Sequence, residues 1–168
     1  MEKLKDPSTA HMLLNMANAY AQKYSGCCKT AVGSALVDTL IRPKLAIFGA
    51  NVTLPHKCTQ IGCLRVEKYG EASKSHRNPE DCRALHSEID AICNAAKLGV
   101  NPEGKCIVVT RYPCESCAKS IIRAGIKHVI YGREFPISDQ TAYMFEAAGV
   151  RVTWISDWSP AGDTDTNY

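Results

Sequence analysis

The sequence predicts an α/β protein whose partly parallel sheet is covered by helices on both faces. In the second half of the chain, short apolar runs alternate with segments of helical periodicity, which is typical of parallel strands joined by helices. A glycine closes each of these helical segments, at Gly99, Gly125 and Gly149. With 168 residues and an apolar fraction of 45%, the chain suits one domain with a single sizeable core.

The first half predicts one helix and a hairpin of strands. Asp6 or Ser8 is a candidate cap for the opening helix. Apolar residues then recur at helical spacing before Gly26, namely Leu13, Met16, Ala17 and Tyr20. Two short apolar runs at 32–37 and 45–50 follow, separated by a polar turn, and we interpret them as paired strands.

Residues 53–81 show little periodicity. So long a loop is unusual inside a compact domain, and we expect it to be functional or to be held by something other than a hydrophobic core. The elements predicted beyond it are helices at 85–98, 114–124 and 139–148 and strands at 106–110, 128–131 and 150–155. We therefore expect a single domain over residues 1–155 and a loosely held tail over residues 156–168.

Composition narrows the function classes. No apolar run is long enough to span a bilayer, and the first residues lack the apolar core of a signal peptide, so we expect a cytoplasmic location without membrane contact. The net charge is +3, and it rises to +6 without the three aspartates of residues 156–168. This charge favours an anionic small molecule over a stable nucleic-acid complex. Nine cysteines in a reducing compartment indicate metal or catalytic roles.

Two segments carry the candidate chemistry. His86 and Glu88 open one predicted helix, and Cys114 and Cys117 open another, preceded by Pro113. Cysteines three residues apart at a helix start point to the same side, and the helix dipole there favours thiolates. One imidazole and two thiolates are three zinc ligands, which leave the fourth tetrahedral position open for catalysis. This combination matches the pattern H-x-E…P-C-x-x-C known for zinc deaminases.

Glu88 is the predicted catalytic residue. Two residues past His86, it points away from the ligand direction but can still reach a water on the open side of the ion. We expect it to carry protons from water to a ring nitrogen and to departing ammonia. Taken singly, the two motifs have simpler interpretations, since redox pairs and half zinc fingers share the cysteine spacing.

The two motifs resemble those of a known enzyme family. CRALHSEIDAI at 82–92 and PCESCAKSIIRAGI at 113–126 are similar to the zinc motifs of deoxycytidylate (dCMP) deaminases, and the likeness runs from about residue 10 to 153. The resemblance implies the cytidine-deaminase fold, a three-layer α/β/α sandwich around a five-stranded mixed sheet. It also implies zinc-dependent conversion of dCMP to dUMP, a homohexamer, and dCTP and dTTP as effectors. The sequence leaves dCTP and methylated dCMP open as alternative substrates.

The same resemblance implies substrate contacts. Asn51 would bond the sugar, the Ser87 amide would bond the pyrimidine carbonyl, and Tyr112 and Pro113 would border the ring. This chain departs from the family where Ser87 replaces the usual Ala, where Asp90 replaces the usual Asn, and where the Gly-Tyr-Asn-Gly turn reads GANV at 49–52.

A second zinc is the expected support of the long loop. Four cysteines resemble a set found in microbial and viral members, and a four-thiolate zinc would tie the loop to its surroundings. They are Cys27, Cys58, Cys63 and Cys82, with Cys28 and His76 as rival ligands. The alternative is that these cysteines are small buried hydrophobes. Cys93 and Cys106 are assigned to the core.

Two other functions remain open. A deaminase acting on a polynucleotide would share the chemistry. It would need a more basic surface and more aromatic residues than the 7% of this chain. A non-catalytic zinc module would share the fold, but it would not need Glu88. The basic residues Lys68, Lys74 and Arg77 are interpreted as a solvated face, with a phosphate contact as the alternative.

Overall fold

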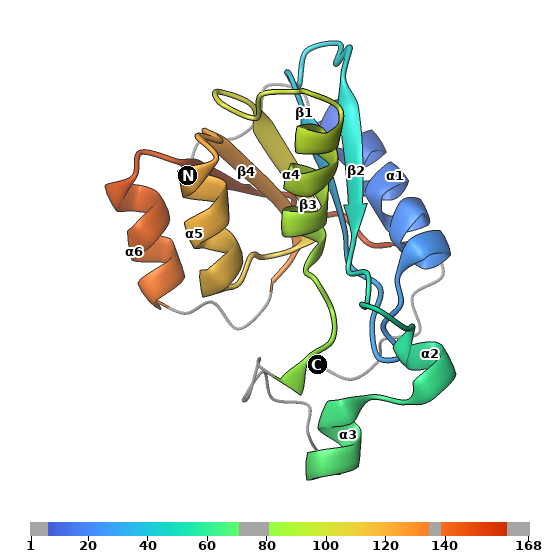
Figure 1. Ribbon diagram of the computed structural model, residues 1–168. Helices are drawn as coiled ribbons and strands as arrows, with labels where there is room; N and C mark the ends of the chain where they lie inside the picture. The colour runs from blue at the N-terminus through green and yellow to red at the C-terminus, as the bar shows by residue number, and fades with distance from the viewer. Residues whose placement is uncertain (1–6, 71–80, 135–138, 161–168) are drawn as a thin grey trace.

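The computed structural model describes residues 7–70, 81–134 and 139–160, and they form a five-stranded mixed sheet between two helical layers (Figure 1). The spatial order of the strands is β2-β1-β3-β4-β5. β1 (Gly33–Val37) pairs antiparallel with β2 (Ala46–Ala50) and with β3 (Cys106–Arg111). β3, β4 (His128–Arg133) and β5 (Arg151–Trp154) run parallel. The predicted fold class and all five strands are confirmed.

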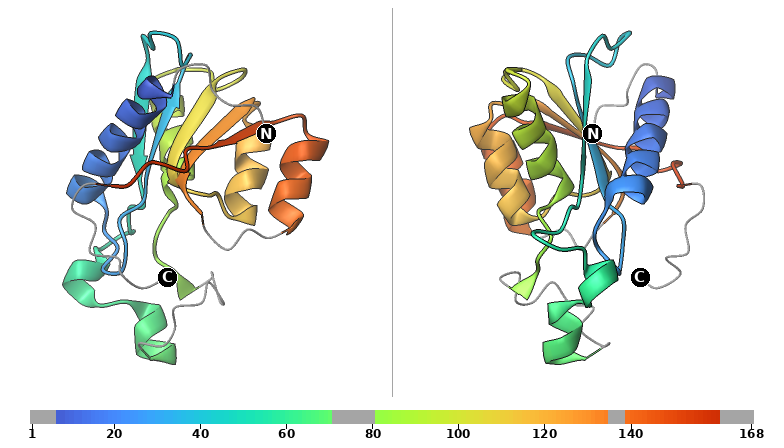
Figure 2. Two further views of the ribbon diagram at one scale, coloured as in Figure 1. Left: turned by 180° about the vertical axis from the view of Figure 1, so that it is seen from behind. Right: turned by 45° about the vertical axis from the view of Figure 1, so that its right-hand side comes forward.

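One helix covers one face of the sheet and three cover the other (Figures 1 and 2). α1 (Ser8–Tyr24) packs on the first face, and α4 (Ser87–Lys97), α5 (Glu115–Arg123) and α6 (Asp139–Ala147) pack on the second. The three central strands β1, β3 and β4 are covered on both faces, which explains their nearly continuous apolar runs. No helix in the described part of the chain is long and apolar enough to cross a membrane.

The hydrophobic core is divided by the sheet. Beneath α4, α5 and α6, the buried cluster includes Leu36, Ile107, Ile121 and Phe145. Beneath α1, the second cluster includes Leu13, Leu14, Val108 and Ile130. Strand residues alternate between the two clusters, as the two-residue repeat of a strand requires. The sheet is therefore held from both faces, and this rigid frame carries the loops at the carboxyl ends of β3 and β4.

The opening helix differs from the prediction in two details. Ser8 is its first helical residue and Pro7 takes the cap position without a side-chain hydrogen bond, while Asp6 lies outside the described residues. Met16 is 43% exposed, so it does not belong to the buried stripe. Leu14 and Ala21 are buried instead. The face of α1 that packs on the sheet is therefore rotated slightly from the face that the sequence predicted to be buried.

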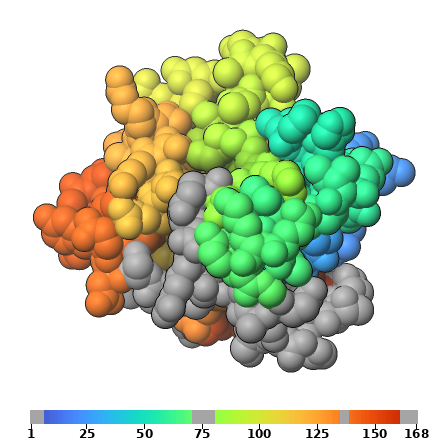
Figure 3. Space-filling model, turned by 60° about the horizontal axis from the view of Figure 1, so that its bottom comes forward, coloured from blue at the N-terminus to red at the C-terminus, as the bar shows by residue number. Residues whose placement is uncertain are grey.

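The segment predicted as an unstructured loop contains two short helices, α2 (Cys58–Ile61) and α3 (Leu64–Tyr69), which project beyond the end of the sheet (Figure 1). The prediction of a loop is wrong there. Helices of four and six residues are too short to show a hydrophobic repeat in a sequence. From below, α3 is a prominent part of the molecular surface (Figure 3).

The tail is packed at its start. Trp158 is 6% exposed, and its indole N–H donates to Asn15 Oδ1 on α1 at 2.8 Å. Its ring lies against Gly132, where any Cβ would approach the ring to 2.1 Å. The expectation of a loose tail beginning at residue 156 is therefore wrong for Trp158, and residues 161–168 lie outside the described part.

Candidate metal centre

His86, Cys114 and Cys117 lie together at the ends of two helices. The ligand atoms of the three residues are all within 4.8 Å of one another, and this is the one such group of His, Cys, Asp and Glu found among the described residues. His86 Nδ1 is 3.3 Å from each sulfur. Two neighbouring ligands of a tetrahedral zinc lie about 3.5 Å apart, given Zn–S and Zn–N lengths of about 2.3 and 2.0 Å, so the trio fits this ion.

Both helices present their amino termini to the trio. His86 is the cap residue of α4 and Cys114 is the cap residue of α5. Cys117 lies one turn further along α5 and is buried. The positive ends of two helix dipoles favour the thiolate form that a metal ligand requires. Helix starts thus supply both the spacing and the charge that the sequence predicted.

Neighbouring strands hold His86 in place. The bridge between Thr53 and Ala84 aligns the segment before His86 with the chain that follows β2. Leu85 N–H donates to the Val52 carbonyl at 2.8 Å and Leu54 N–H to the Arg83 carbonyl at 3.2 Å. These bonds extend the sheet into the region of the metal centre.

The two thiols differ strongly in acidity. Hydrogen bonds from Cys117 and His86 lower the pKa of Cys114 to about 4. The pKa of Cys117 is raised, because its thiol proton is shared with Cys114 and because it is buried. The hydrogen bond with Cys114 likewise raises the pKa of His86. The trio thus holds protons that a bound cation would displace, which is the behaviour of a metal site with two thiolates.

Glu88 is buried beside the trio. It is 4% exposed, and the Ser87 hydroxyl donates to its Oε2 at 3.0 Å. Burial raises the pKa of Glu88, while the positive charge of His86 opposes that shift. A buried carboxyl group with a raised pKa holds its proton more readily than an exposed one, which suits a group that both accepts and donates protons.

The predicted substrate residues are differently engaged. Asn51 is 6% exposed, and its side chain donates to the Thr30 carbonyl at 2.8 Å and accepts from Val32 N–H at 2.9 Å. Ser87 is fully buried and lies next to Glu88. Tyr112 is 5% exposed, with its ring packed edge-on against Tyr131 at 4.9 Å between centroids.

Asp90 has a structural partner in the backbone of β2. Its Oδ2 accepts the Ala50 N–H at 3.0 Å, so this carboxylate ties α4 to the end of β2. An asparagine oxygen could accept the same bond. The departure from the family at this position therefore preserves the contact and adds a negative charge.

The remaining cysteines do not form a second compact trio in the described chain. Burial raises the pKa of the Cys28 thiol, and the thiols of Cys27, Cys58 and Cys63 raise it further. Cys28 therefore lies near these three cysteines. Cys82 is not among the neighbours that raise this pKa. Cys93 is exposed on α4, so its assignment to the core is wrong, whereas Cys106 packs against the cluster beneath α1.

Sequence reasoning also missed two arginines. Arg111 and Arg133 are the last residues of β3 and β4, and they lie side by side in the parallel register. The available signal was an arginine at the end of each of two apolar runs. Of the basic loop residues, Lys68 pairs with Asp81, and Lys74 and Arg77 lie outside the described residues.

Known proteins resemble this chain over most of its length. The model of the cytidine and deoxycytidylate deaminase zinc-binding region matches residues 7–133. ComE operon protein 2 of Bacillus subtilis is 34% identical over 131 residues, covering 76% of this chain and 61% of that protein. Deoxycytidylate deaminase of Schizosaccharomyces pombe is 30% identical over 149 residues, covering 87% of this chain and 44% of that protein. This chain thus spans less than two thirds of either curated relative.

A solved structure shares the architecture. The dCMP deaminase of the cyanophage S-TIM5, in complex with dCMP and dUMP, superposes with a TM-score of 0.69 at 26% identity. The alignment covers 90% of this chain and 100% of that one. The similarity thus includes both layers of helices and the sheet between them.

Proposed function

The chain belongs to the cytidine and deoxycytidylate deaminase zinc-binding family, and from this premise we propose that it hydrolyses dCMP to dUMP and ammonia. The observation that carries the proposal is the buried Glu88 beside the trio of His86, Cys114 and Cys117. A purely structural zinc site has no need of a buried carboxyl group at that place, because its protein ligands already satisfy the ion.

The side chains divide the reaction between them. When bound, zinc supplies the Lewis acidity that makes water a nucleophile near neutral pH. Glu88 accepts a proton from the attacking water and passes it to the ring nitrogen next to the carbon that bears the amine. It then takes the remaining proton of the added hydroxyl group and delivers it to the departing amine, so that the ring carbon keeps the oxygen as a carbonyl and ammonia leaves. The Ser87 hydroxyl orients the carboxyl group for these transfers.

Substrate binding is proposed for four residues. The Ser87 amide at the start of α4 would bond the pyrimidine carbonyl. Asn51 would bond the sugar, because its Nδ2 keeps a second hydrogen beyond the one given to Thr30. Tyr112 and Pro113 would border the ring, chiefly through the backbone between β3 and α5, because the tyrosine ring is packed in the core. dCTP and methylated dCMP are further candidate substrates.

A second, structural zinc is part of the proposal. Its ligands are Cys27, Cys58 and Cys63, with Cys82 or Cys28 as the fourth. Lys29 N–H donates to Cys27 Sγ at 3.4 Å, as backbone amides do to thiolate ligands. A homohexamer in the cytoplasm, with dCTP and dTTP as effectors, is proposed on the family resemblance alone.

Glu88→Gln tests the proposed function. The zinc-loaded variant should keep its fold and zinc content but lose about 10²–10⁴-fold in kcat on dCMP, because the amide cannot carry protons. Ultraviolet absorbance with dCMP, dCTP, CMP, cytidine and deoxyadenylate measures turnover and substrate preference. Glu115→Gln is the matched control, since Glu115 is an exposed carboxylate on α5 that pairs with Lys119.

Two outcomes would contradict the proposal. The first is full activity of Glu88→Gln, which would remove the proton carrier from the mechanism. The second is failure of the zinc-loaded wild type to deaminate any cytosine mononucleotide. A salt-sensitive affinity for RNA or single-stranded DNA in that second case would favour the polynucleotide deaminase instead.

A further inference from the structure

We propose that Asp81 is a positioning residue of the metal centre, because it ties α3 to the short segment that ends at His86. The inference rests on the proposed function, which it deepens by naming a residue that keeps a metal ligand in place. Asp81 is 9% exposed and lies five residues before His86 in the chain. It acts through His86 and not on the reacting atoms.

Asp81 collects its partners from one face of α3. The Tyr69 hydroxyl donates to Asp81 Oδ2 at 2.7 Å, and the Lys68 ammonium group pairs with Oδ1. Arg65, Lys68 and Tyr69 are spaced by three and four residues, so they share a face of the helix. No described residue of α3 belongs to either hydrophobic cluster. The position of this helix against the body of the protein therefore depends strongly on polar contacts such as these.

Arg65 extends the same face toward the metal centre. It is 8% exposed, although it belongs to a short helix at the end of the molecule. The hydrogen bond with Cys114 raises the pKa of His86, and the charge of Arg65 opposes this rise. The positive charge of Arg65 acts on the Asp81 carboxylate as well. The guanidinium group is thus within electrostatic reach of both residues, and α3 flanks the start of the segment and its end.

The segment between Asp81 and His86 is held from two directions. On one side, the backbone bonds of residues 83 and 85 join it to the chain that follows β2. On the other side, the Arg83 guanidinium donates to the Gly62 carbonyl at 3.3 Å, and Asp81 binds α3. A segment of so few residues carries a displacement of Asp81 to His86, because little chain lies between them to absorb it.

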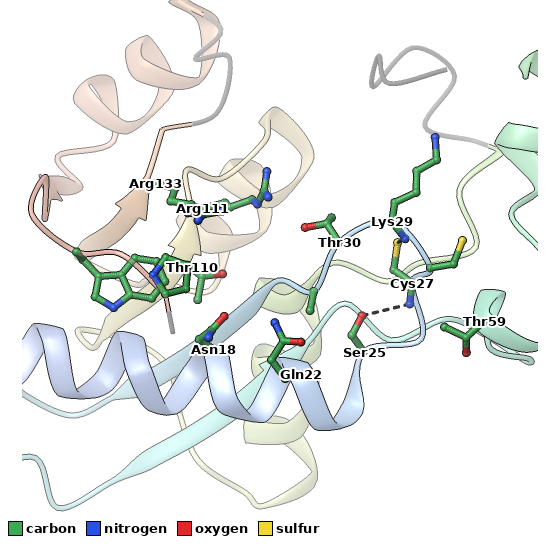
Figure 4. Close-up of a pocket in the computed structure, with 14 residues that line it drawn as sticks. Asn18, Gln22, Ser25, Cys27, Lys29, Thr30, Thr59, Thr110, Arg111 and Arg133 are labelled. Carbon is green, nitrogen blue, oxygen red and sulfur yellow. Dashed lines mark hydrogen bonds between the residues drawn. The ribbon is translucent and has the colours of Figure 1, made fainter. Parts of the chain in front are cut away.

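The cleft beside α1 is separate from this contact. Its described lining residues include neither Asp81 nor a residue of α3; among them are Asn18, Thr110 and Arg133 (Figure 4). The proposed substrate residues Asn51 and Tyr112 also lie outside α3. A change at Asp81 should therefore leave these groups in place and act on the metal centre.

Asp81→Ala tests the inference in the full chain. We expect the affinity of the site with His86 for metal to fall about tenfold, because contacts that orient a ligand contribute on this scale. Titration with Co²⁺ measures this affinity, since a site with one imidazole and two thiolates absorbs differently from a site with four thiolates. In the zinc-loaded variant, kcat for dCMP should fall by a similar factor, while KM changes at most about twofold.

Asp38→Ala is the matched control. The Asp38 carboxylate also fastens a loop, because its Oδ1 accepts the backbone N–H groups of Thr39, Lys44 and Leu45. Asp38 follows β1 at the end of the sheet where β3 begins, whereas the metal ligands Cys114 and Cys117 follow the end of β3. The control should lose Tm without a change in metal affinity or kcat.

Tyr69→Phe gives a second reading with less disturbance. It removes one donor to Asp81 and keeps the pair with Lys68, so the affinity of the site with His86 should fall less than in Asp81→Ala. This variant decides the matter if Asp81→Ala does not fold.

Three results would overturn the inference. The first is unchanged affinity at the site with His86 in every folded variant of Asp81 and Tyr69. The second is an equal loss of affinity in Asp38→Ala, which would reduce the effect to general stability. The third is a loss confined to the four-thiolate site. Weaker binding at the site with His86 in a protein that deaminates no cytosine nucleotide would refute the proposed function and leave the positioning role standing.

Discussion

His128 lies buried on β4 with both ring nitrogens in hydrogen bonds. Arg151 Nη2 donates to Nδ1 at 2.9 Å, so Nε2 carries the proton and donates to Thr153 Oγ1 at 2.8 Å. The residue is 2% exposed. Burial and, secondarily, the charge of Arg151 lower the pKa of His128 to about 4. The imidazole is therefore neutral in the folded protein, and its protonation would break the bond from Arg151.

This residue predicts a pH-dependent stability. The unfolded chain binds a proton at His128 below about pH 6.5 and the folded chain only below about 4, so stability is lost as the pH falls through this window. Between pH 7 and 5 the wild type should lose about 2 kcal/mol more than His128→Gln. Urea unfolding of both proteins at both pH values measures this difference. The zinc ligands titrate equally in the two proteins, so their contribution cancels. Parallel pH profiles of the two proteins would contradict it.

At the scale of elements, α4 depends on its close approach to β2. A Cβ on Gly49 would lie 2.2 Å from the Ser87 carbonyl oxygen and 2.5 Å from the Ala91 nitrogen. Both are backbone atoms of α4, so the helix itself would have to move. The Ser34 hydroxyl donates to the same Ser87 carbonyl at 2.7 Å, which fixes the start of the helix from β1.

Gly49→Ala should displace the start of α4 and with it His86. We expect a loss of about 2 kcal/mol in the free energy of unfolding, together with weaker zinc binding, because overpacking shifts a helix that carries a ligand. Gly99→Ala is the control at the other end of α4, where φ is +67° and nothing lies within 4 Å. It should cost about 1 kcal/mol in stability with zinc affinity unchanged. Competition with a chromogenic chelator measures the affinity, and equal values for wild type and Gly49→Ala would contradict the prediction.

At the scale of the whole molecule, the segment with α2 and α3 stands apart from both hydrophobic clusters (Figure 1). Ile61 and Tyr69 are 44% and 47% exposed. The contacts that hold the segment are polar: Asp81 accepts from Lys68 and Tyr69, and Arg83 donates to the Gly62 carbonyl. A segment with so little apolar burial gains most from a metal that crosslinks it.

Metal analysis tests this account. The wild type should contain two zinc ions per chain and Cys58→Ser one, with a lower Tm and faster proteolysis of the segment, because its crosslink is lost. Cys93→Ser should retain two, since Cys93 is an exposed cysteine that belongs to neither proposed set of ligands. A single zinc in the wild type would refute the second site and leave the catalytic trio unaffected.

The sequence by itself determined the features that depend on short stretches of chain. Helical and strand periodicity located every main element to within a few residues, because each pattern repeats over one face of one element. The trio of His86, Cys114 and Cys117 was predictable for a related reason. Cys114 and Cys117 are brought together by the start of a single helix, whereas His86 belongs to the start of another. The fold therefore only had to bring the two helix starts into contact.

Tertiary structure decided what depends on partners far along the chain. It turned the ring of Tyr112 into the core, bound Asn51 to the turn before β1, buried Trp158 under α1, and set Arg111 beside Arg133. No local pattern encodes these outcomes. Each is chosen by the packing of a side chain against whatever surface the sheet brings to it, and that surface exists only after strands distant in sequence have paired.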